Sequence, residues 1–417
     1  PALHVYNLAG LVMLAALARP DIAPPEMLAL FLLGAVVGYA IVSALPAVFF
    51  SAPDESAIFM VLPGQRYLLE GRGFEAAALV GAGGLGALVA LLVLAPFASL
   101  ILPPFKTLVQ PHFHWIVGVI IVFMLMSEWP RGGSEGPPIR RFLGAWQGLA
   151  AGLLTFFLSG IMGLVLMYRT LVPAAVAFQN LLPAFVGLFS IPAALVGLFA
   201  RARIPDQRVE RQLDVSPGLL ARGVAAGTMG GLFAAFFPAV TGGVGGFLAG
   251  HATAQRDERV FIVSQGASKV TYYVGAYLLF FVPRLHLVRG GLAGMVSAQY
   301  TPQTPAEFVT ALAAVALAGA VAFALLLLYS AFVARRLAHT SQRLIAALTL
   351  LVLLVVVAGM AGINGLLVAG AATGIGLLPI AFNTRRMNCL GVLLLPIFLN
   401  MAGLGGAVAG WLLAAGS

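Results

Sequence analysis

Long, nearly uninterrupted apolar runs most restrict how this chain can fold. Ala76–Leu102 and Leu344–Gly362 are each long enough to cross a bilayer as a helix, which takes about 20 residues. Of the 417 residues, 61% are hydrophobic and only 9% are charged, whereas about a quarter of a soluble domain is charged. Because the runs are continuous rather than alternating, a β-barrel is excluded. The sequence predicts an all-α polytopic membrane protein with about 10–12 transmembrane helices, located in the cell membrane.

The remaining charge lies mostly in short loops. The net charge is +9, and two of the 23 basic residues are lysines, so 21 are arginines. The basic loops 131–141, 201–211, 335–343 and 385–386 are separated by even numbers of predicted spans, which places them all on the cytoplasmic side. This topology accounts for the basic excess, so no nucleic-acid partner is expected. The single cysteine, Cys389, excludes a disulfide framework and a cysteine-based metal cluster.

One predicted span is broken by a proline, a threonine and five glycines, in the stretch Phe237–Gly250. Backbone groups left unpaired in lipid cost several kcal/mol each, so a broken helix survives only inside protein or beside a polar cavity. Amides at a helix N-terminus favour anions. We therefore predict a re-entrant or broken helix tip at residues 238–246 that binds a ligand. The alternative is tight helix packing through small residues. The predicted binding residues of this tip are Pro238, Thr241, Gly242, Gly243 and Gly245.

The chain also shows weak internal repetition. Pro1–His4 resembles residues 237–241, and Ser159–Ile161 with Leu181–Pro183 resembles Thr373–Ile375 with Leu394–Pro396. Two similar halves with interrupted helices at matching places are typical of secondary transporters. We predict two inverted repeats, residues 1–205 and 206–417, the first expected to lack its start. Chance alignment of apolar sequence is the alternative. On the repeat hypothesis, Pro1, His4 and Asn7 face the glycine tip and join the binding site.

Ionisable residues within the apolar chain give further candidates. Lys269, preceded by Gln265 and Ser268, is one of two lysines, and an ammonium inside a helical bundle is usually paired or functional. Snorkelling to an interface is the alternative. Asp54 and Glu55 are either a helix cap or ligands of a coupling Na⁺ or H⁺. No metal-ligand spacing, cofactor motif or catalytic motif occurs, so no enzyme is predicted.

Four segments resemble one known family. PALHVYN, SAPDESAIFMVLPGQRYLLEGRGFEAAAL, FFPAVTGGVGGFLAG and TGIGLLPIAFNTRRMNCLGVLLLP are similar to the archaeal-type branch of TctA-like proteins, the large permease subunits of tripartite tricarboxylate transporters. The similarity covers essentially the whole chain. Where that family carries a glycine after the tip proline, this chain has Ala2 and Ala239. The resemblance implies an inverted-repeat permease that moves a small organic anion, driven by an ion gradient.

Three functions remain open from the sequence. The first is the secondary transporter of a small organic anion such as a carboxylate, for which Lys269 and Arg169 are the basic candidates near spans. The second is a translocase of an anionic lipid such as polyprenyl phosphate. The third is a non-transporting subunit of a membrane complex. The partners compatible with the resemblance are an extracytoplasmic binding protein, a small membrane subunit and a second copy of the chain.

Overall fold

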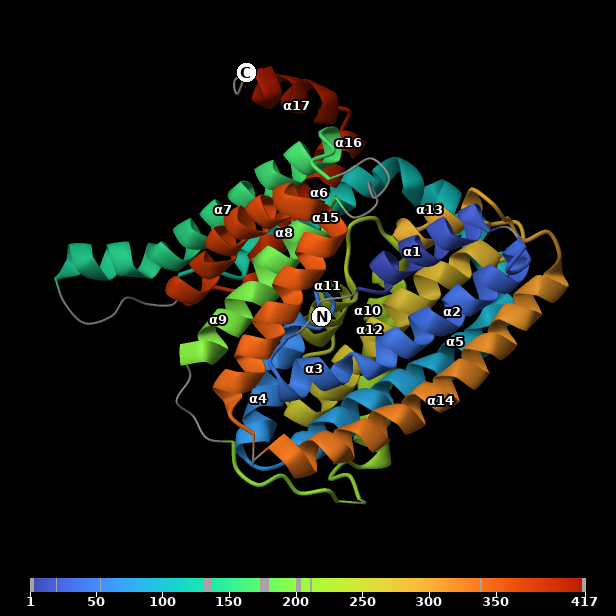
Figure 1. Ribbon diagram of the computed structural model, residues 1–417, viewed down its shortest axis with the longest axis horizontal. Helices are drawn as coiled ribbons and strands as arrows, with labels where there is room; N and C mark the ends of the chain where they lie inside the picture. Colours follow the sequence, from blue (N-terminus) through green and yellow to red (C-terminus); the bar gives the residue numbers. More distant parts are fainter. Residues whose placement is uncertain are drawn as a thin grey trace. The chain divides into compact units, whose positions relative to one another are not determined.

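The structure, a computed structural model, describes residues 4–19, 21–52, 54–130, 137–172, 180–199, 204–210, 212–337 and 340–414. These residues form helices joined by turns, and the described part of the chain contains no strand (Figure 1). The predicted all-α class is therefore confirmed.

The helices form two compact units. One contains residues 3–110 and 198–345, and the other contains residues 111–197 and 346–417. Each unit thus takes one stretch from each predicted repeat, so the units cut across the boundary between residues 205 and 206. The division into two repeats stays a prediction.

The first unit is arranged around α12 (Glu258–Phe281), most of whose residues are buried. Its main neighbours are α2 (Pro25–Val42), α5 (Gly73–Val109), α10 (Pro217–Phe236) and α11 (Gly242–Ala252). The remaining elements of this unit are α1 (Val5–Ala18), α3 (Ala44–Phe49), η1 (Ile58–Met60), α4 (Val61–Leu69), α13 (Gly290–Ser297) and α14 (Pro305–Leu337), and η2 (Gln110–His112) follows α5.

Glycines bring α12 close to α5. A Cβ added to Gly266 would lie 2.2 Å from the Val80 carbonyl oxygen, and one added to Gly83 would lie 2.2 Å from that of Val263. The two helices therefore touch backbone to backbone, as small residues permit in membrane proteins. At the start of α12, the Asp257 side chain accepts the Arg259 N–H at 2.8 Å, and hydrogen bonds from the Arg259 side chain lower the pKa of Asp257. This cap fixes where α12 begins.

The second unit is built on α7 (Pro138–Tyr168) and α15 (Gln342–Ala381). Leu182, Val186 and Ile191 form an apolar core with Leu353, Val357 and Ala369 of α15. Gly362 interrupts α15 with φ 66° and ψ −163°, a left-handed conformation that glycine adopts without a Cβ penalty. The other elements of this unit are α6 (Phe113–Met126), α8 (Leu182–Phe185), η4 (Val186–Ser190), α9 (Ile191–Phe199), η5 (Arg386–Leu390), α16 (Gly391–Met401) and α17 (Gly405–Ala414).

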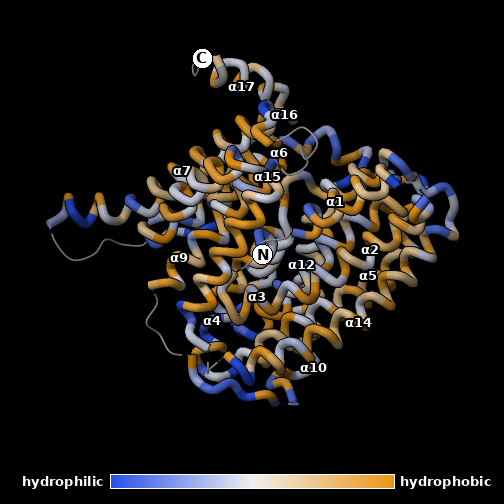
Figure 2. Tube along the Cα trace, viewed as in Figure 1, coloured by the Kyte–Doolittle hydropathy of each residue, from blue (hydrophilic) through white to orange (hydrophobic). Residues whose placement is uncertain are grey.

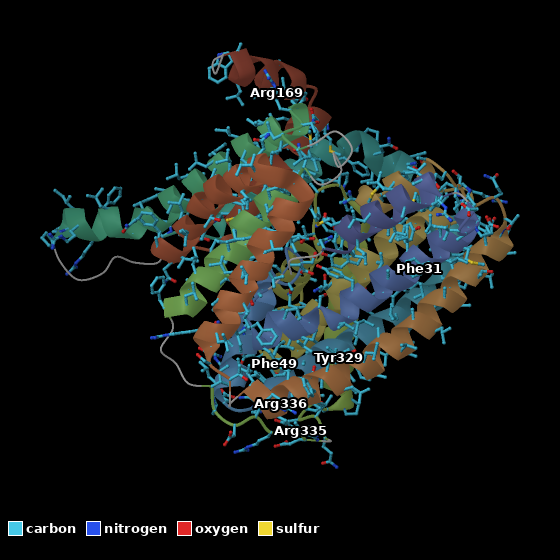
Figure 3. All side chains as sticks on the ribbon, in the orientation of Figure 1. Phe31, Phe49, Arg169, Tyr329, Arg335 and Arg336 are labelled. Carbon is cyan, nitrogen blue, oxygen red and sulfur yellow. The ribbon has the colours of Figure 1, made fainter. Side chains whose placement is uncertain are left out.

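Seven helical segments among the described residues are long and apolar enough to span a membrane. This is fewer than the ten to twelve spans expected from sequence, and the apolar helices Val5–Ala18 and Arg386–Met401 are too short to be counted. Two further features lower the number. Gly73–Met126 counts once although it joins α5 to α6, and α12 is not counted among the seven. Apolar residues run along most helices in Figure 2, and many are exposed, as lipid-facing residues are. At the end of α14, the exposed side chains of Arg335 and Arg336 begin one of the basic loops (Figure 3).

The predicted helix break is confirmed. Helix α10 ends at Phe236 and α11 starts at Gly242, so residues 237–241 connect them without helical structure. Within this connection Ala239 has φ 62°, in the left-handed region that costs an L-residue about 1–2 kcal/mol. The position where the related family carries glycine is thus one at which glycine would be unstrained.

We expect Ala239→Gly to raise the free energy of unfolding by about 0.5 kcal/mol, because relief of the left-handed strain exceeds the added freedom of the unfolded chain. Unfolding in detergent micelles measures this. As control, Ala313→Gly within α14 should lower the free energy of unfolding by about 0.5–1 kcal/mol. A destabilisation by Ala239→Gly equal to the control would contradict the strain at residue 239.

Candidate functional site

The first turn of α11 lies against the turn formed by Asp54–Ser56. Thr241 caps α11, since its Oγ1 accepts the Val244 N–H at 3.4 Å and donates to the Glu55 carbonyl oxygen at 3.4 Å. A Cβ added to Gly243 would lie 3.1 Å from the Ser56 carbonyl oxygen. Among the described residues, the Gly242 and Gly243 amides have no hydrogen-bond partner. They are the free donors at the positive end of the helix.

A buried ion pair lies directly beside this tip. Lys269 Nζ is 2.8 Å from Asp54 Oδ2, and the two side chains are 0% and 4% exposed. Each partner is further satisfied: Lys269 donates to Ser43 Oγ at 2.8 Å, and Asp54 accepts from Tyr39 Oη at 3.0 Å and from the Ser56 N–H at 3.1 Å. The ammonium lies 5.7 Å from the centre of the Tyr39 ring. Lys269 therefore does not snorkel to an interface, because its buried ammonium is paired with Asp54 inside the protein.

Glu55 connects the start of the chain to the tip. Its Oε1 lies 2.7 Å from Tyr273 Oη and 3.2 Å from His4 Nε2, and His4 caps α1 by accepting the Tyr6 N–H on Nδ1. The same residue accepts Thr241 Oγ1 on its backbone oxygen. The N-terminal segment and the glycine tip, 237 residues apart between His4 and Thr241, thus meet at one glutamate.

The sequence analysis missed a cation at the end of α10. Arg289 donates from Nε to the Ala235 carbonyl at 3.2 Å and from Nη2 to the carbonyls of Ala234, at 3.4 Å, and Phe237. It also interacts electrostatically with Tyr6 and Tyr272. In the sequence, Arg289 follows Arg284 and His286 in a short segment between two apolar runs, a pattern that is typical of a surface loop. The adjacent Gly290 has φ 76°, and a Cβ added to it would lie 3.3 Å from Tyr6 Oη. The backbone beside Arg289 is therefore closely packed.

The other predicted site residues lie around α11 with different roles. Ser268 donates to the Gly242 carbonyl at 2.7 Å. The Gln265 amide is 0% exposed, lies beside Gly246, and has no hydrogen-bond partner among the described residues. Gly245 packs against Gly230 of α10, with an added Cβ 2.2 Å from its oxygen, which agrees with the packing alternative. Pro238 is half-buried in the break and Asn7 is buried in α1.

Two predicted residues do not belong to this cluster as described. Pro1 lies outside the described residues, as does Pro53 beside Asp54. Arg169 belongs to the second unit, where it is exposed and follows the last residue of α7 (Figure 3). It is a helix-end residue rather than a charge within a span.

These features define a class of protein. A multi-pass α-helical protein with a helix broken beside a fully buried ion pair has the arrangement of a membrane transporter, in which discontinuous helices carry the binding site. The chain belongs to the tripartite tricarboxylate transporter TctA family, whose model matches residues 1–391. The resemblance drawn from sequence is confirmed, and so is the expectation of a multi-pass membrane protein. TctA is a transporter family, which is consistent with the prediction that the chain is not an enzyme.

One relative is similar to this chain over most of its length. MJ1079 of Methanocaldococcus jannaschii, described as an uncharacterised protein, is 24% identical over 374 residues, which cover 88% of this chain and 87% of the relative. No solved structure matches this chain.

We expect Lys269→Met to lower the free energy of unfolding by about 3–5 kcal/mol, because it leaves the Asp54 carboxylate buried without its partner. The double variant Asp54→Asn/Lys269→Met should recover at least half of that loss. Unfolding in detergent micelles measures both.

The matched control for this pair is Arg66→Met. Arg66 pairs with Glu258 at 3.3 Å, but its side chain is 68% exposed, so its loss should cost less than about 1 kcal/mol. Equal losses for Lys269→Met and Arg66→Met would contradict a buried, coupled pair.

Proposed function

We propose that the protein is a secondary active transporter of a small organic anion such as a carboxylate, driven by an ion gradient. The observation that carries this is the convergence of α1 and the α10–α11 break on Glu55 inside one helical unit. Broken helices that meet from two parts of a chain form the binding sites of many transporters. The unpaired amides of Gly242 and Gly243 provide donors for an anion at the N-terminus of α11.

Charge at the break favours an anion once Arg289 is included. The C-terminus of α10 carries a partial negative charge and the N-terminus of α11 a partial positive one, each equivalent to about half an elementary charge. Alone they cancel. Arg289 covers the α10 carbonyls with a full positive charge, so the break becomes net positive. We propose that Arg289, Thr241 and the glycine amides hold one carboxylate, with His4, Asn7, Gln265 and Ser268 around it.

In this proposal Lys269 does not touch the substrate. Its ammonium is bound by Asp54 and Ser43, so it fixes the Asp54–Ser56 turn against which α11 packs. The coupling ion, Na⁺ or H⁺, is assigned to the acidic pair Asp54 and Glu55. Pro238 and Gly245 are assigned structural roles in the glycine tip.

An anionic lipid is the second candidate substrate. A cavity of about 360 Å³ lies beside the break and is lined almost wholly by apolar residues, among them Phe236, Phe237, Phe105 and Leu278. Phe105 is partly exposed on α5, so an acyl chain could enter from lipid while its phosphate meets Arg289.

We also propose three partners: an extracytoplasmic binding protein, a small membrane subunit and a second copy of this chain. If no flux of any substrate occurs, the protein is a non-transporting subunit of a membrane complex.

We expect Arg289→Gln to raise the KM for uptake at least tenfold, because it removes the cation at the break. The measurement is uptake of radiolabelled citrate, succinate and acetate into proteoliposomes under an imposed pH or sodium gradient. Arg289→Lys should fall between wild type and Arg289→Gln, since an ammonium keeps the charge but not the forked donors.

Arg284→Gln is the control, because Arg284 lies on the same loop with its side chain exposed. An unchanged KM in Arg289→Gln would overturn the role of Arg289. Saturable scrambling of a labelled polyprenyl phosphate, with no flux of the carboxylates, would show that the substrate is the anionic lipid and not a small carboxylate.

A further inference from the structure

We infer that the second unit binds the phosphate group of an anionic membrane lipid at residues 384–388, between α15 and the middle of η5. The helix break belongs to the first unit, so this inference does not depend on the proposed transport function. Three residues of the segment each keep a buried polar atom without a hydrogen-bond partner among the described residues. These atoms are Thr384 Oγ1, Arg386 Nη1 and Asn388 Oδ1. Because each such atom costs free energy, three of them together indicate a bound molecule.

Hydrogen bonds hold this segment in place on both sides of Arg386. The carboxylate oxygen Oε1 of Glu128 accepts the Arg385 backbone N–H at 2.7 Å and Asn388 Nδ2 at 3.3 Å. Asn388 is fully buried, and its backbone oxygen accepts the Ser159 hydroxyl at 3.3 Å. Moving the loop to satisfy the Arg386 guanidinium would therefore break hydrogen bonds that the segment already makes.

The segment lies over a glycine face of α7. A Cβ added to Gly148 would lie 3.9 Å from Thr384 Cγ2, and one added to Gly152 would lie 2.9 Å from Asn388 Nδ2. Gly148 and Gly152 are four residues apart and so share one face of the helix. Among the described residues outside that turn of α7, no other atom comes within 4 Å of the Gly148 Cβ position. The glycine therefore leaves space beside the Thr384 side chain.

The charge and the donors of the segment suit a phosphate group. Arg385 and Arg386 carry two positive charges, and the acid that bonds to the segment, Glu128, carries one negative charge, so one positive charge remains. A basic loop by itself follows from membrane topology and needs no ligand. A buried guanidinium N–H without a partner does not, because a cation that only marks one side of the membrane can keep its N–H groups in water. Arg386 and the Thr384 hydroxyl both donate, and arginine N–H groups bind phosphate oxygens strongly.

An aromatic pair indicates that this segment lies at the depth of the lipid headgroups. The rings of Trp129 and Trp146 are 5.4 Å apart, and the two residues are 51% and 37% exposed. Trp129 directly follows Glu128, which bonds to the segment, and Trp146 lies two residues before Gly148, which contacts Thr384. Exposed tryptophans gather where the apolar layer of a membrane meets the headgroups. The phosphate within reach of Arg386 is then that of a lipid.

The first test measures lipid binding without transport. Native mass spectra of the protein in detergent, with equal amounts of phosphatidylglycerol and phosphatidylcholine, should show phosphatidylglycerol retained about tenfold better. Arg386→Gln should abolish this preference, and Thr384→Val should reduce it about threefold. Arg335→Gln is the matched control, because Arg335 is an exposed arginine at the end of an apolar helix of the first unit. An equal loss in Arg335→Gln, or no preference in the wild type, would overturn the proposal.

The second test separates a lipid from a free anion. Phosphatidylglycerol should raise the midpoint of thermal unfolding of the wild type by several degrees, because it binds the folded state. Inorganic phosphate should leave the midpoint unchanged, and an equal rise with inorganic phosphate would overturn the lipid assignment. If Arg386→Gln does not fold, Thr384→Val decides, because valine has the shape of threonine without its hydroxyl. The rise with phosphatidylglycerol should be smaller in Thr384→Val, and a rise equal to that of the wild type would contradict the site.

Discussion

The buried ion pair between Asp54 and Lys269 is the interaction on which the site depends. Two full charges out of water are costly unless each is paired and hydrogen-bonded, and here Ser43, Tyr39 and the Ser56 amide complete the shells of both. The pair ties the turn after α3 to the middle of α12. Because α11 packs on that turn and α10 packs on α12, the pair also fixes where the helix break lies.

Once Lys269 is committed to Asp54, the charge available to a ligand must come from elsewhere. The break has equal and opposite helix ends, which alone favour neither sign. Arg289 shifts the balance by covering the carbonyls of α10. Ionised Glu55, which His4 and Tyr273 contact, shifts it back by one negative charge. In the proposed function, this small set of charges decides whether an anion binds at the break.

The sequence predicts much of this fold because the apolar runs leave few alternatives. The break at residues 237–241 could be predicted from its proline and glycines. The two compact units could not be predicted, because they combine segments from both halves.

Other parts of the site were beyond sequence for physical reasons. The sequence suggested that Lys269 binds the ligand. Its partner Asp54 is 215 positions away, and the apolar residues around Lys269 do not indicate which acid it pairs with. Arg289 and Tyr273 were missed because an arginine in a loop and a tyrosine in a buried helix are ordinary. Gly245 was expected to approach a ligand, whereas its nearest neighbour is the backbone of Gly230. In each case the deciding information was which residues meet in space.

The most direct test of the central claim is a cryo-electron microscopy structure with a saturating carboxylate at a pH below 6. The account predicts density for the anion between the Arg289 guanidinium and the Gly242 and Gly243 amides, with Lys269 still bound to Asp54. Density for the anion on Lys269, with the Asp54 contact broken, or a continuous helix through residues 237–241 would contradict it.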